Sequence, residues 1–484
     1  MPKPSRREFL SAVAGAAGSF AFLPNAVRLA NATEIANRAL AASPDAAPAT
    51  GWASVPGILG RIRAPKFPGR DFPIRKYGAV PDGVTDCTTA FRDAIAACTK
   101  ARGGRVVVEG GTFLTGAIHL ASNVNLHVAK DATIRFTRDT KAYLPAVLTR
   151  YEGTELMNYS PFIYAYDATN VAITGEGTLD GQADAQNWWT WKGGNNRKPG
   201  DPDMRPAHDR LLKMGEDGTP VAQRTFGEGD FLRPQFIQPY RCTNVLIEGV
   251  TIKNSPMWEI NPVLCTNVTV RHVHIDSHGP NNDGCDPESC KDVLIEHCIF
   301  DTGDDCIAIK SGRNGDGRRL HVPSENLIIR DCEMKDGHGG VTLGSECSGD
   351  IRNVFVERCK MDSPKLDRAL RLKNNAMRGG TLEHIYMRDV TVGEVSDAIL
   401  QVDFLYEEGA KGPFTPIARD IEMQRVTSRK SKYGVYLVAY DKATIDDIRL
   451  IDCTFDGVAN GDKVDHVTRF TRKNVRQNGT LVTE

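Results

Sequence analysis

Two neighbouring glycine-rich turns hold acidic residues that apolar packing does not explain. The first turn lies in GPNNDGCDPESC, residues 279–290, and contains Asp283. The second lies in DTGDDCIAIKSG, residues 301–312, and contains Asp304 and Asp305. Ionised carboxylates that lie close together repel each other unless a cation or a water lies between them. This pattern therefore indicates a site for cation binding or for acid–base catalysis.

Four short segments align as equivalent strands of successive turns and gather polar residues at one corner. The aligned segments are 285–288, 307–310, 341–344 and 370–373. The residues that the alignment brings together are Asn282, Asp283, Asp304, Asp305, Lys310, His338, Arg371 and Lys373. Asp283 and Asp305 fall in one column, and Lys310 and Lys373 share another. A slip of one residue in the alignment would turn each side chain to the opposite face.

The acidic corner has three interpretations. In the first, Asn and Asp side chains only bond to the backbone of their turns, which suits Asn123, Asn170 and Asn244. That interpretation leaves Asp283 and Asp305 repelling each other. In the second, the carboxylates bind calcium, but such a site has a fuller set of oxygen ligands and no adjacent His, Arg and Lys. We favour the third, a water held for nucleophilic attack, and we expect no metal and no other cofactor.

A short phrase that recurs from residue 123 onward predicts the fold. It consists of an Asn, Asp or His followed by alternating apolar residues, and it begins at positions 123, 170, 244, 267, 292, 326, 353, 384, 420 and 447. Each phrase has the period-two pattern of a short strand, and no helical pattern separates neighbouring phrases. Repeats of this kind are typical of a solenoid. We predict an all-β, single-domain parallel β-helix over residues 66–470.

Cysteine alternates with valine six places after the start of the phrases. The cysteines at this position are Cys298, Cys332, Cys359 and Cys453. Twelve cysteines in an exported chain would ordinarily suggest disulfides. Because valine fills the same position in neighbouring turns, we interpret these four as small buried hydrophobic residues and not as metal ligands.

Segments outside the repeat have distinct compositions. Residues 1–32 contain Arg6-Arg7, a short apolar run and an Ala-Asn-Ala cleavage site, which is typical of a twin-arginine signal peptide. Residues 33–65 are rich in Ala and Pro and predict a spacer with little structure. Residues 182–232 form a Trp-rich insertion that we expect to shape the binding face, and residues 471–484 a C-terminal tail.

An amphipathic helix is predicted before the first coil, within residues 86–104. We expect it to cap the open edge of the solenoid. The net charge is balanced, with 60 Lys and Arg against 61 Asp and Glu. No overall field attracts nucleic acid or a membrane surface, and we expect neither as a partner once the signal is removed. We expect a monomer.

Four motifs resemble those of the polygalacturonases, glycoside hydrolase family 28. They are Asn281-Asn282-Asp283, Gly303-Asp304-Asp305, Gly337-His338-Gly339 and Arg371-Leu372-Lys373, in the order usual for that family. The chain departs from the usual pattern at Asn282 and Leu372, where Thr and Ile are common. The resemblance covers about residues 70–460. It implies a right-handed parallel β-helix that hydrolyses α-1,4-linked galacturonan with inversion at the anomeric carbon.

The resemblance also implies roles for the acidic residues. Asp304 would protonate the departing glycosidic oxygen, while Asp283 and Asp305 would hold and deprotonate the attacking water. Inverting glycosidases generally separate acid and base by about 6.5 to 9.5 Å to admit that water. A like-charged environment would raise the pKa of the acid and keep it protonated. His338 would orient Asp304 or a sugar hydroxyl.

Basic and polar residues would bind the substrate, a pectic polysaccharide or an oligogalacturonide. Arg371 and Lys373 would hold the carboxylate of galacturonate, the Arg through two hydrogen bonds. Asn282, Lys310 and Tyr406 are further candidates for substrate binding, and the family places a tyrosine on a later coil near the site.

The mode of action is less constrained than the chemistry. The runs KSGRNGDGRR, residues 310–319, and GSE, residues 344–346, resemble exo-acting members, which release units from a chain end. The alternatives within the family are an endo-polygalacturonase and a rhamnogalacturonan-type hydrolase. Outside it, they are a calcium-dependent pectate lyase and a non-catalytic carbohydrate-binding β-helix. The signal predicts that the protein works in the periplasm or is secreted.

Overall fold

The computed structural model describes residues 50–193, 198 and 200–483. Residues Gly51–Glu484 form one compact unit. The predicted signal peptide, residues 1–32, lies outside the described residues. Within the described ranges, no helix is both long enough and apolar enough to cross a membrane.

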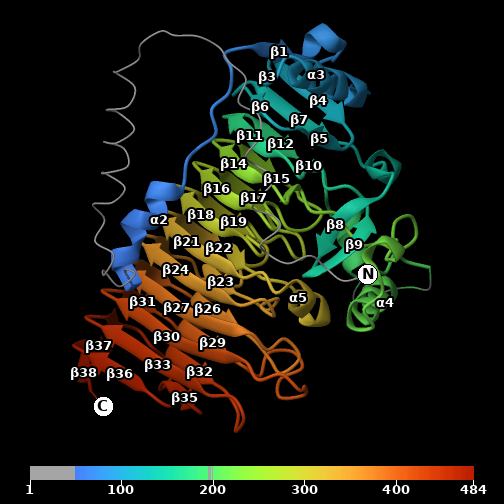
Figure 1. The fold of residues 1–484 in the computed structure, drawn as a ribbon. Coiled ribbons are helices and arrows are strands. Elements are labelled where there is room, and N and C mark those ends of the chain that lie inside the picture. The colour runs from blue at the N-terminus through green and yellow to red at the C-terminus, as the bar shows by residue number, and fades with distance from the viewer. Residues whose placement is uncertain (1–49, 194–197, 199, 484) are drawn as a thin grey trace, which may run out of the picture. The chain divides into compact units, whose positions relative to one another are not determined.

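Residues Gly51–Glu484 form a parallel β-helix with three faces (Figure 1). The first face is a 13-stranded sheet in the order β1 (Asp71–Pro73), β3 (Gly104–Val108), β6 (Val124–Val128), β11 (Thr169–Gly175), β14 (Thr243–Glu248), β16 (Thr266–Arg271), β18 (Lys291–Glu296), β21 (Ser324–Arg330), β24 (Ile351–Glu357), β27 (Thr381–Arg388), β30 (Ile417–Gln424), β33 (Ile445–Ile451) and β36 (Phe470–Lys473). The second is a 14-stranded sheet in the order β2 (Asp82–Asp86), β4 (Gly111–Thr115), β7 (Ala132–Phe136), β12 (Thr178–Asp180), β15 (Thr251–Lys253), β17 (His274–Ser277), β19 (Ile299–Thr302), β22 (Glu333–Asp336), β25 (Lys360–Met361), β28 (Thr391–Glu394), β31 (Thr427–Lys430), β34 (Thr454–Phe455), β37 (Val475–Gln477) and β38 (Thr480–Val482).

The third face consists of two shorter sheets joined by isolated bridges. The first contains β5 (Ile118–Leu120), β10 (Ile163–Tyr166) and β13 (Ile237–Tyr240). The second contains β20 (Ile307–Ile309), β23 (Val341–Leu343), β26 (Arg368–Lys373), β29 (Ala398–Asp403), β32 (Tyr433–Val438) and β35 (Lys463–Asp465). Bridges from Ile237 to Ile260, then to Cys285 and then to Ile307, connect them. The predicted all-β parallel β-helix is confirmed.

The repeated phrase begins where each coil turns onto the first face. Asn123, Asn170 and Asn244 have φ values of 64°, 58° and 60°, a left-handed conformation that Asn adopts more readily than most residues. Asn170 Nδ2 donates to Asn123 Oδ1 at 2.9 Å, and Asn244 Nδ2 donates to Asn170 Oδ1 at 2.9 Å. These asparagines are therefore structural, as predicted, but they bond to each other across coils and not only to the backbone.

The interior is filled by the inward-facing apolar residues of the three faces. All twelve cysteines are free and buried, so the interpretation of the cysteine column as part of the core is confirmed. The predicted capping helix is α3 (Thr88–Lys100), which buries Phe91, Ala94, Ile95 and Cys98. It begins where Asp86 Oδ1 accepts a hydrogen bond from the Thr88 amide at 2.9 Å, and it packs against β1 and β3 at the N-terminal end of the coils.

Part of the segment that was predicted to be a spacer with little structure is ordered. Within residues 33–65, η2 (Gly51–Ser54) and α2 (Val55–Arg61) lie against the outer side of the 13-stranded sheet (Figure 1). The apolar residues in this contact include Val55, Ile58, Ile62, Leu294, Ile328 and Phe355. Composition alone was misleading because the few apolar residues of this segment meet an apolar stripe on the sheet. The strands β36, β37 and β38 occupy most of the predicted tail, residues 471–484.

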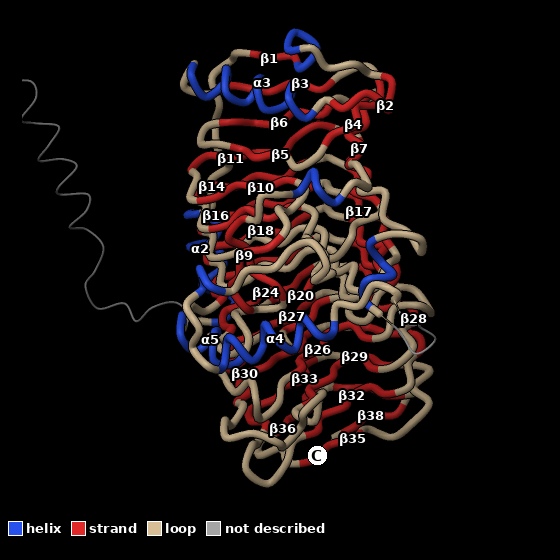
Figure 2. The backbone as a smooth tube through the Cα atoms, turned by 90° about the vertical axis from the view of Figure 1, so that its right-hand side faces the viewer, coloured by secondary structure: helices blue, strands red, loops and turns tan. Residues whose placement is uncertain are grey.

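The predicted insertion, residues 182–232, packs beside a hairpin that precedes it. The hairpin consists of β8 (Val147–Tyr151) and β9 (Thr154–Asn158). The remaining described helices are η3 (Ile74–Tyr77), η4 (Thr140–Tyr143), η5 (Trp188–Lys192), α4 (Arg205–Glu216), η6 (Val221–Gln223) and α5 (Asn314–Leu320). The α4 helix packs against both β9 and α5 (Figure 2). Hairpin and insertion thus form one block beside the third face.

Candidate active site

A cavity of about 310 Å³ opens on the third face beside β20 and β26. Seven of the nine residues predicted for the site line it: Asp283, Asp304, Lys310, His338, Arg371, Lys373 and Tyr406. Asp305 lies beneath this lining and accepts hydrogen bonds from Arg371 and Lys373. Asn282 does not line the cavity.

Strand register positions these residues. Cys285 bridges to Ile307, Ile307 pairs with Val341, and Val341 pairs with Leu370. The four-segment alignment predicted from the sequence is therefore confirmed residue for residue. The carboxylates that precede the first two segments by two residues lie in neighbouring coils as a consequence. Arg371 and Lys373 alternate with inward apolar neighbours and therefore point outward.

The three aspartates form a compact acidic group. One carboxylate oxygen each from Asp283, Asp304 and Asp305 lies within 4.8 Å of the others. This closest approach is shorter than the separation of about 6.5 to 9.5 Å that is general for inverting glycosidases, so the distance does not itself support inversion. Asp304 Oδ1 accepts a hydrogen bond from the Asp305 amide at 2.9 Å and lies 3.0 Å from His338 Nδ1. That hydrogen bond raises the pKa of His338.

Asp305 is held as an anion by the two basic residues of β26. Lys373 Nζ donates to Asp305 Oδ2 at 2.7 Å, and Arg371 Nη1 donates to Oδ1 at 3.3 Å. Thr342 Oγ1 donates to the same Oδ1 at 2.8 Å. Burial alone would raise the pKa of Asp305, but the charges of Lys373 and Arg371 outweigh it and hold the pKa below its ordinary value. Asp305 is thus ionised at mildly acidic pH.

Asp283 has the opposite electrostatic environment. Burial and the charge of Asp304 raise its pKa well above the ordinary value, against the opposing charge of Lys310. Lys310 Nζ lies 3.8 Å from Asp283 Oδ2, and Asp283 Oδ1 has no hydrogen-bond partner among the described residues. The sequence predicted that like charges would raise the pKa of the acid Asp304. In the structure a raised pKa occurs at Asp283, one of the two residues predicted to hold and deprotonate the water.

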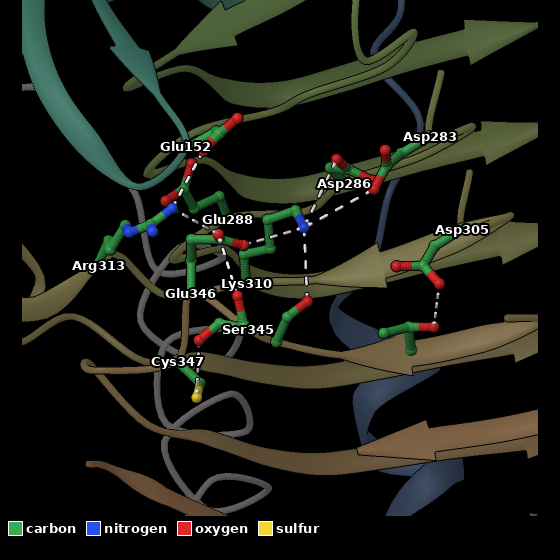
Figure 3. Close-up of polar contacts among 12 residues, drawn as sticks. Glu152, Asp283, Asp286, Glu288, Asp305, Lys310, Arg313, Ser345, Glu346 and Cys347 are labelled. Atoms are coloured by element: carbon green, nitrogen blue, oxygen red, sulfur yellow. Dashed lines mark hydrogen bonds and ion pairs between the residues drawn. The ribbon is translucent and has the colours of Figure 1, made fainter. Parts of the chain in front are cut away.

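Lys310 is the centre of a buried ionic network (Figure 3). Its Nζ lies 3.1 Å from Glu346 Oε2, 4.0 Å from Asp286 Oδ2 and 4.5 Å from the centre of the Trp258 ring. Burial would lower the pKa of Lys310, but Glu346 and Asp286 outweigh it and raise the pKa. Lys310 is therefore charged, and its charge is shared among several buried carboxyl groups.

The prediction that Asn282 binds substrate does not agree with its position. Asn282 is buried, and its Oδ1 accepts hydrogen bonds from Ser277 Oγ at 2.8 Å and from the Gly279 amide at 2.6 Å. Its Nδ2 donates to the carbonyls of Ser255 and Met257. The side chain fixes the turn below the cavity and has no hydrogen-bonding capacity to spare. Asn281, one residue earlier, lines the cavity instead.

Tyr406 lies where the family resemblance suggested. Its ring centre lies 5.4 Å from Lys373 Nζ and 5.6 Å from Arg371 Cζ. An aromatic face so placed keeps both cations directed toward the cavity.

Eight residues of the lining were not among the predicted site residues. These are Glu152, Lys192, Trp258, Asn281, Arg313, Ser345, Glu346 and Glu407. Arg313 Nη1 donates to Glu152 Oε2 at 3.0 Å and lies 3.6 Å from Glu346 Oε1, so it joins the β8–β9 turn to the coil (Figure 3). Burial would raise the pKa of Glu346, but Lys310 and Arg313 lower it to about 2. Arg313 and Glu346 lie in the two runs that resembled exo-acting members, and that resemblance was the available signal.

The hairpin covers the third face on the N-terminal side of the cavity. Gln235 Nε2 donates to the Arg150 carbonyl at 2.8 Å, and Gln238 Nε2 donates to Asn261 Oδ1 at 2.8 Å beneath the hairpin. Arg150 Nη1 lies 3.3 Å from Glu288 Oε1, with both side chains buried. The face is closed at this end.

Comparison with known proteins agrees with this geometry. The model of Glycosyl hydrolases family 28 matches residues 225–476. The solved structure of a hyperthermoactive exopolygalacturonase from Thermotoga maritima is 45% identical, with a TM-score of 0.86, and the match covers 88% of this chain and 96% of that one. An endo-polygalacturonase of Pectobacterium carotovorum subsp. carotovorum is 26% identical over 77% of this chain and 87% of its own length.

A probable polygalacturonase of Vitis vinifera is 30% identical over 328 residues, which is 65% of this chain. The match spans 59% of the Vitis protein, less than two thirds of its length. The family model nevertheless covers more than half of the present chain, including every coil that contributes an aspartate to the cavity. With its coils in the predicted register and its carboxylates paired with outward basic residues, this chain belongs to glycosyl hydrolase family 28.

Proposed function

We propose that this protein hydrolyses α-1,4-linked galacturonan from a chain end, with inversion at the anomeric carbon. The observation that carries the proposal is the cavity itself, where Asp283 and Asp304 in the lining and Asp305 directly beneath it lie beside three basic residues, Lys310, Arg371 and Lys373. Acidic groups can move protons at a glycosidic bond, and cationic groups attract an anionic sugar to the same place. Inversion is the general outcome in this family.

We assign the catalytic roles as the four family motifs imply them. Asp304, which faces the cavity, donates a proton to the glycosidic oxygen as the bond to the anomeric carbon breaks. Asp305, kept ionised by Lys373, and Asp283 hold a water, whose oxygen forms the new bond and whose proton passes to a carboxylate. His338 orients Asp304 through its 3.0 Å contact. The aspartate oxygens within 4.8 Å of one another are close enough for one water to bridge two of them.

Attack at a chain end is supported by the closed side of the cavity. The β8–β9 hairpin covers the face next to Glu288, and Lys192 of the insertion lines the cavity from the same block. A polymer could not extend past this block in both directions. The terminal sugar unit would occupy the cavity, and the rest of the chain would leave over β29, β32 and β35.

The product profile tests this proposal. Incubated with polygalacturonate and a chelator, the purified protein is expected to release short galacturonates from the first minutes while viscosity falls slowly. Early mixed oligomers with a rapid loss of viscosity would indicate endo action. An unsaturated product that absorbs ultraviolet light, and that no longer forms when a chelator is added, would indicate a lyase. Binding of the polymer without new reducing ends would indicate a non-catalytic module. We also propose export of the protein to the periplasm or the medium through residues 1–32.

A further inference from the structure

An unassigned row of outward side chains leads away from the cavity on the C-terminal side of the third face. Arg371 pairs in register with Gln401, Gln401 with Tyr436, and Tyr436 with Lys463. Residues paired in parallel strands point to the same side of the sheet. The four strands involved, β26, β29, β32 and β35, follow one another directly (Figure 1). The row therefore starts at the substrate-binding arginine and advances one coil at a time.

Gln401 has hydrogen-bonding capacity that the protein does not use. The residue is only 6% exposed, yet no hydrogen bond of its side chain occurs within the described ranges. The amide oxygen and nitrogen of Gln401 are not sealed from solvent. They therefore face the open side of the sheet. The Gln401 amide is therefore free to bond to water or to a ligand on this face. A ligand on this face would supply the missing partner.

Tyr436 and Lys463 offer two further kinds of contact. The Tyr436 ring is partly exposed and is supported edge-on by Tyr433, with ring centres 5.4 Å apart. Lys463 Nζ lies 4.9 Å from the centre of the Tyr436 ring and 3.4 Å from its hydroxyl. A supported aromatic face suits the apolar face of a pyranose ring. The exposed ammonium suits a carboxylate.

The two ends of this face differ in a way that gives the row its direction. On the N-terminal side the corresponding position, Gln238, lies under the hairpin and is bonded to Asn261. On the C-terminal side Lys463 is exposed, and no described segment covers it. Successive coils are about 4.8 Å apart, so Lys463 lies about 14 Å beyond Arg371 along the row. That length accommodates several sugar units of an extended chain.

We propose that Gln401, Tyr436 and Lys463 form subsites for the galacturonate units that extend out of the cavity. The inference rests on the proposed function and deepens it, because it names an oligogalacturonate of three or more units as the preferred substrate. Asp403, in register with Lys373, is an acid beside the row. Burial raises its pKa, and its Oδ1 accepts a hydrogen bond from the Leu405 amide at 2.8 Å.

Chain-length dependence tests the subsites. kcat/KM is measured on di-, tri- and tetragalacturonate for the wild type, Tyr436→Ala, Lys463→Gln and the double variant. The ratio of the tetramer value to the dimer value is expected to fall about three- to tenfold in the double variant, as for the loss of one exposed ion pair and one aromatic contact. Tyr166→Ala and Lys473→Gln are matched controls. Tyr166, at the end of β10, is 41% exposed, and Lys473 is exposed on the 13-stranded sheet.

Each outcome decides the proposal. If the wild-type ratio is near one, or if the variants lower activity on all lengths equally, the row is not a set of subsites, although the hydrolase proposal stands. If the wild type cleaves no galacturonate, the proposed function fails, and calorimetric titration with tetragalacturonate then tests the row alone. Weaker binding by the double variant than by the two control variants would support the row, and equal binding would overturn it.

Discussion

The substitution Lys373→Met tests two roles of Lys373, of which only one was predicted from the sequence. From the sequence, Lys373 was expected to bind only the substrate carboxylate, so its loss should spare methyl-esterified chains. In the structure its Nζ also donates to Asp305 Oδ2 at 2.7 Å, and the side chains are 9% and 0% exposed. Removing the ammonium leaves a buried carboxylate with weaker support. The variant should therefore lose activity on the esterified substrate as well.

The magnitude follows from the lost contact. A hydrogen bond between charged groups is worth roughly 1.5 to 3 kcal/mol, which corresponds to about one to two pH units for the group that it stabilises. Asp305 has a depressed pKa when folded, so its ionised form contributes stability above the ordinary aspartate value, and that stability disappears as pH falls through the folded value. Without Lys373, the acid limb of the kcat/KM profile should move up by about one to two pH units.

The assay compares kcat/KM against pH on polygalacturonate and on its methyl ester, with Lys360→Met as the matched control. Lys360 is exposed on the 14-stranded sheet, where its Nζ lies 3.3 Å from Glu333. On both substrates the Lys373 variant should be about ten- to a hundredfold slower near the acid limb. Urea unfolding at neutral pH should show a loss of stability that shrinks as the medium is acidified. An unshifted acid limb together with full activity on the ester would refute this reasoning and return Lys373 to substrate binding alone.

Two further substitutions test the site and the core. Asp304→Asn should lower kcat by about 10²- to 10⁴-fold, the usual contribution of a general acid. The loss should be smaller on substrates that have good leaving groups. Near-normal turnover, or an equal loss in the neighbouring Asp301→Asn control, would show that Asp304 is not the general acid. Cys332→Val should fold and keep full activity, because Cys332 is buried and unbridged and the two side chains are close in volume. A large drop in melting temperature would contradict the interpretation of the cysteine column.

The coils and their register could be predicted because a β-helix repeats its local rules. The left-handed turn at Asn123, Asn170 and Asn244 recurs at the same place in each coil, and the period of two then determines which side chains face outward. Once one coil is aligned, parallel pairing aligns the next. For this reason the predicted columns at Asp283 and Asp305 agreed with the structure without adjustment.

Single residues within a turn were less predictable, because a turn does not have the alternation of a strand. Asn282 and Asn281 are adjacent, and a motif treats them as one unit. In the structure the Asn282 side chain points inward and makes four hydrogen bonds with nearby residues, whereas Asn281 lines the cavity. The same limit applied to residues 55–61, whose helix depends on an apolar stripe of a remote sheet and not on its own composition.

The closed end of the cavity shows why the mode of attack was the hardest property to predict. Glu152 comes from the hairpin, and Arg313 and Glu346 come from two different coils, so no local pattern joins them. Burying any one of these charges alone would be strongly unfavourable, and each is stabilised only because the other segments supply its partner. The block that closes the face is thus held by the same ionic network that reaches Asp283 through Lys310. The closed end of the cavity and the electrostatics of its carboxylates therefore depend on the same set of ion pairs. A sequence motif that includes only the aspartates predicts neither property.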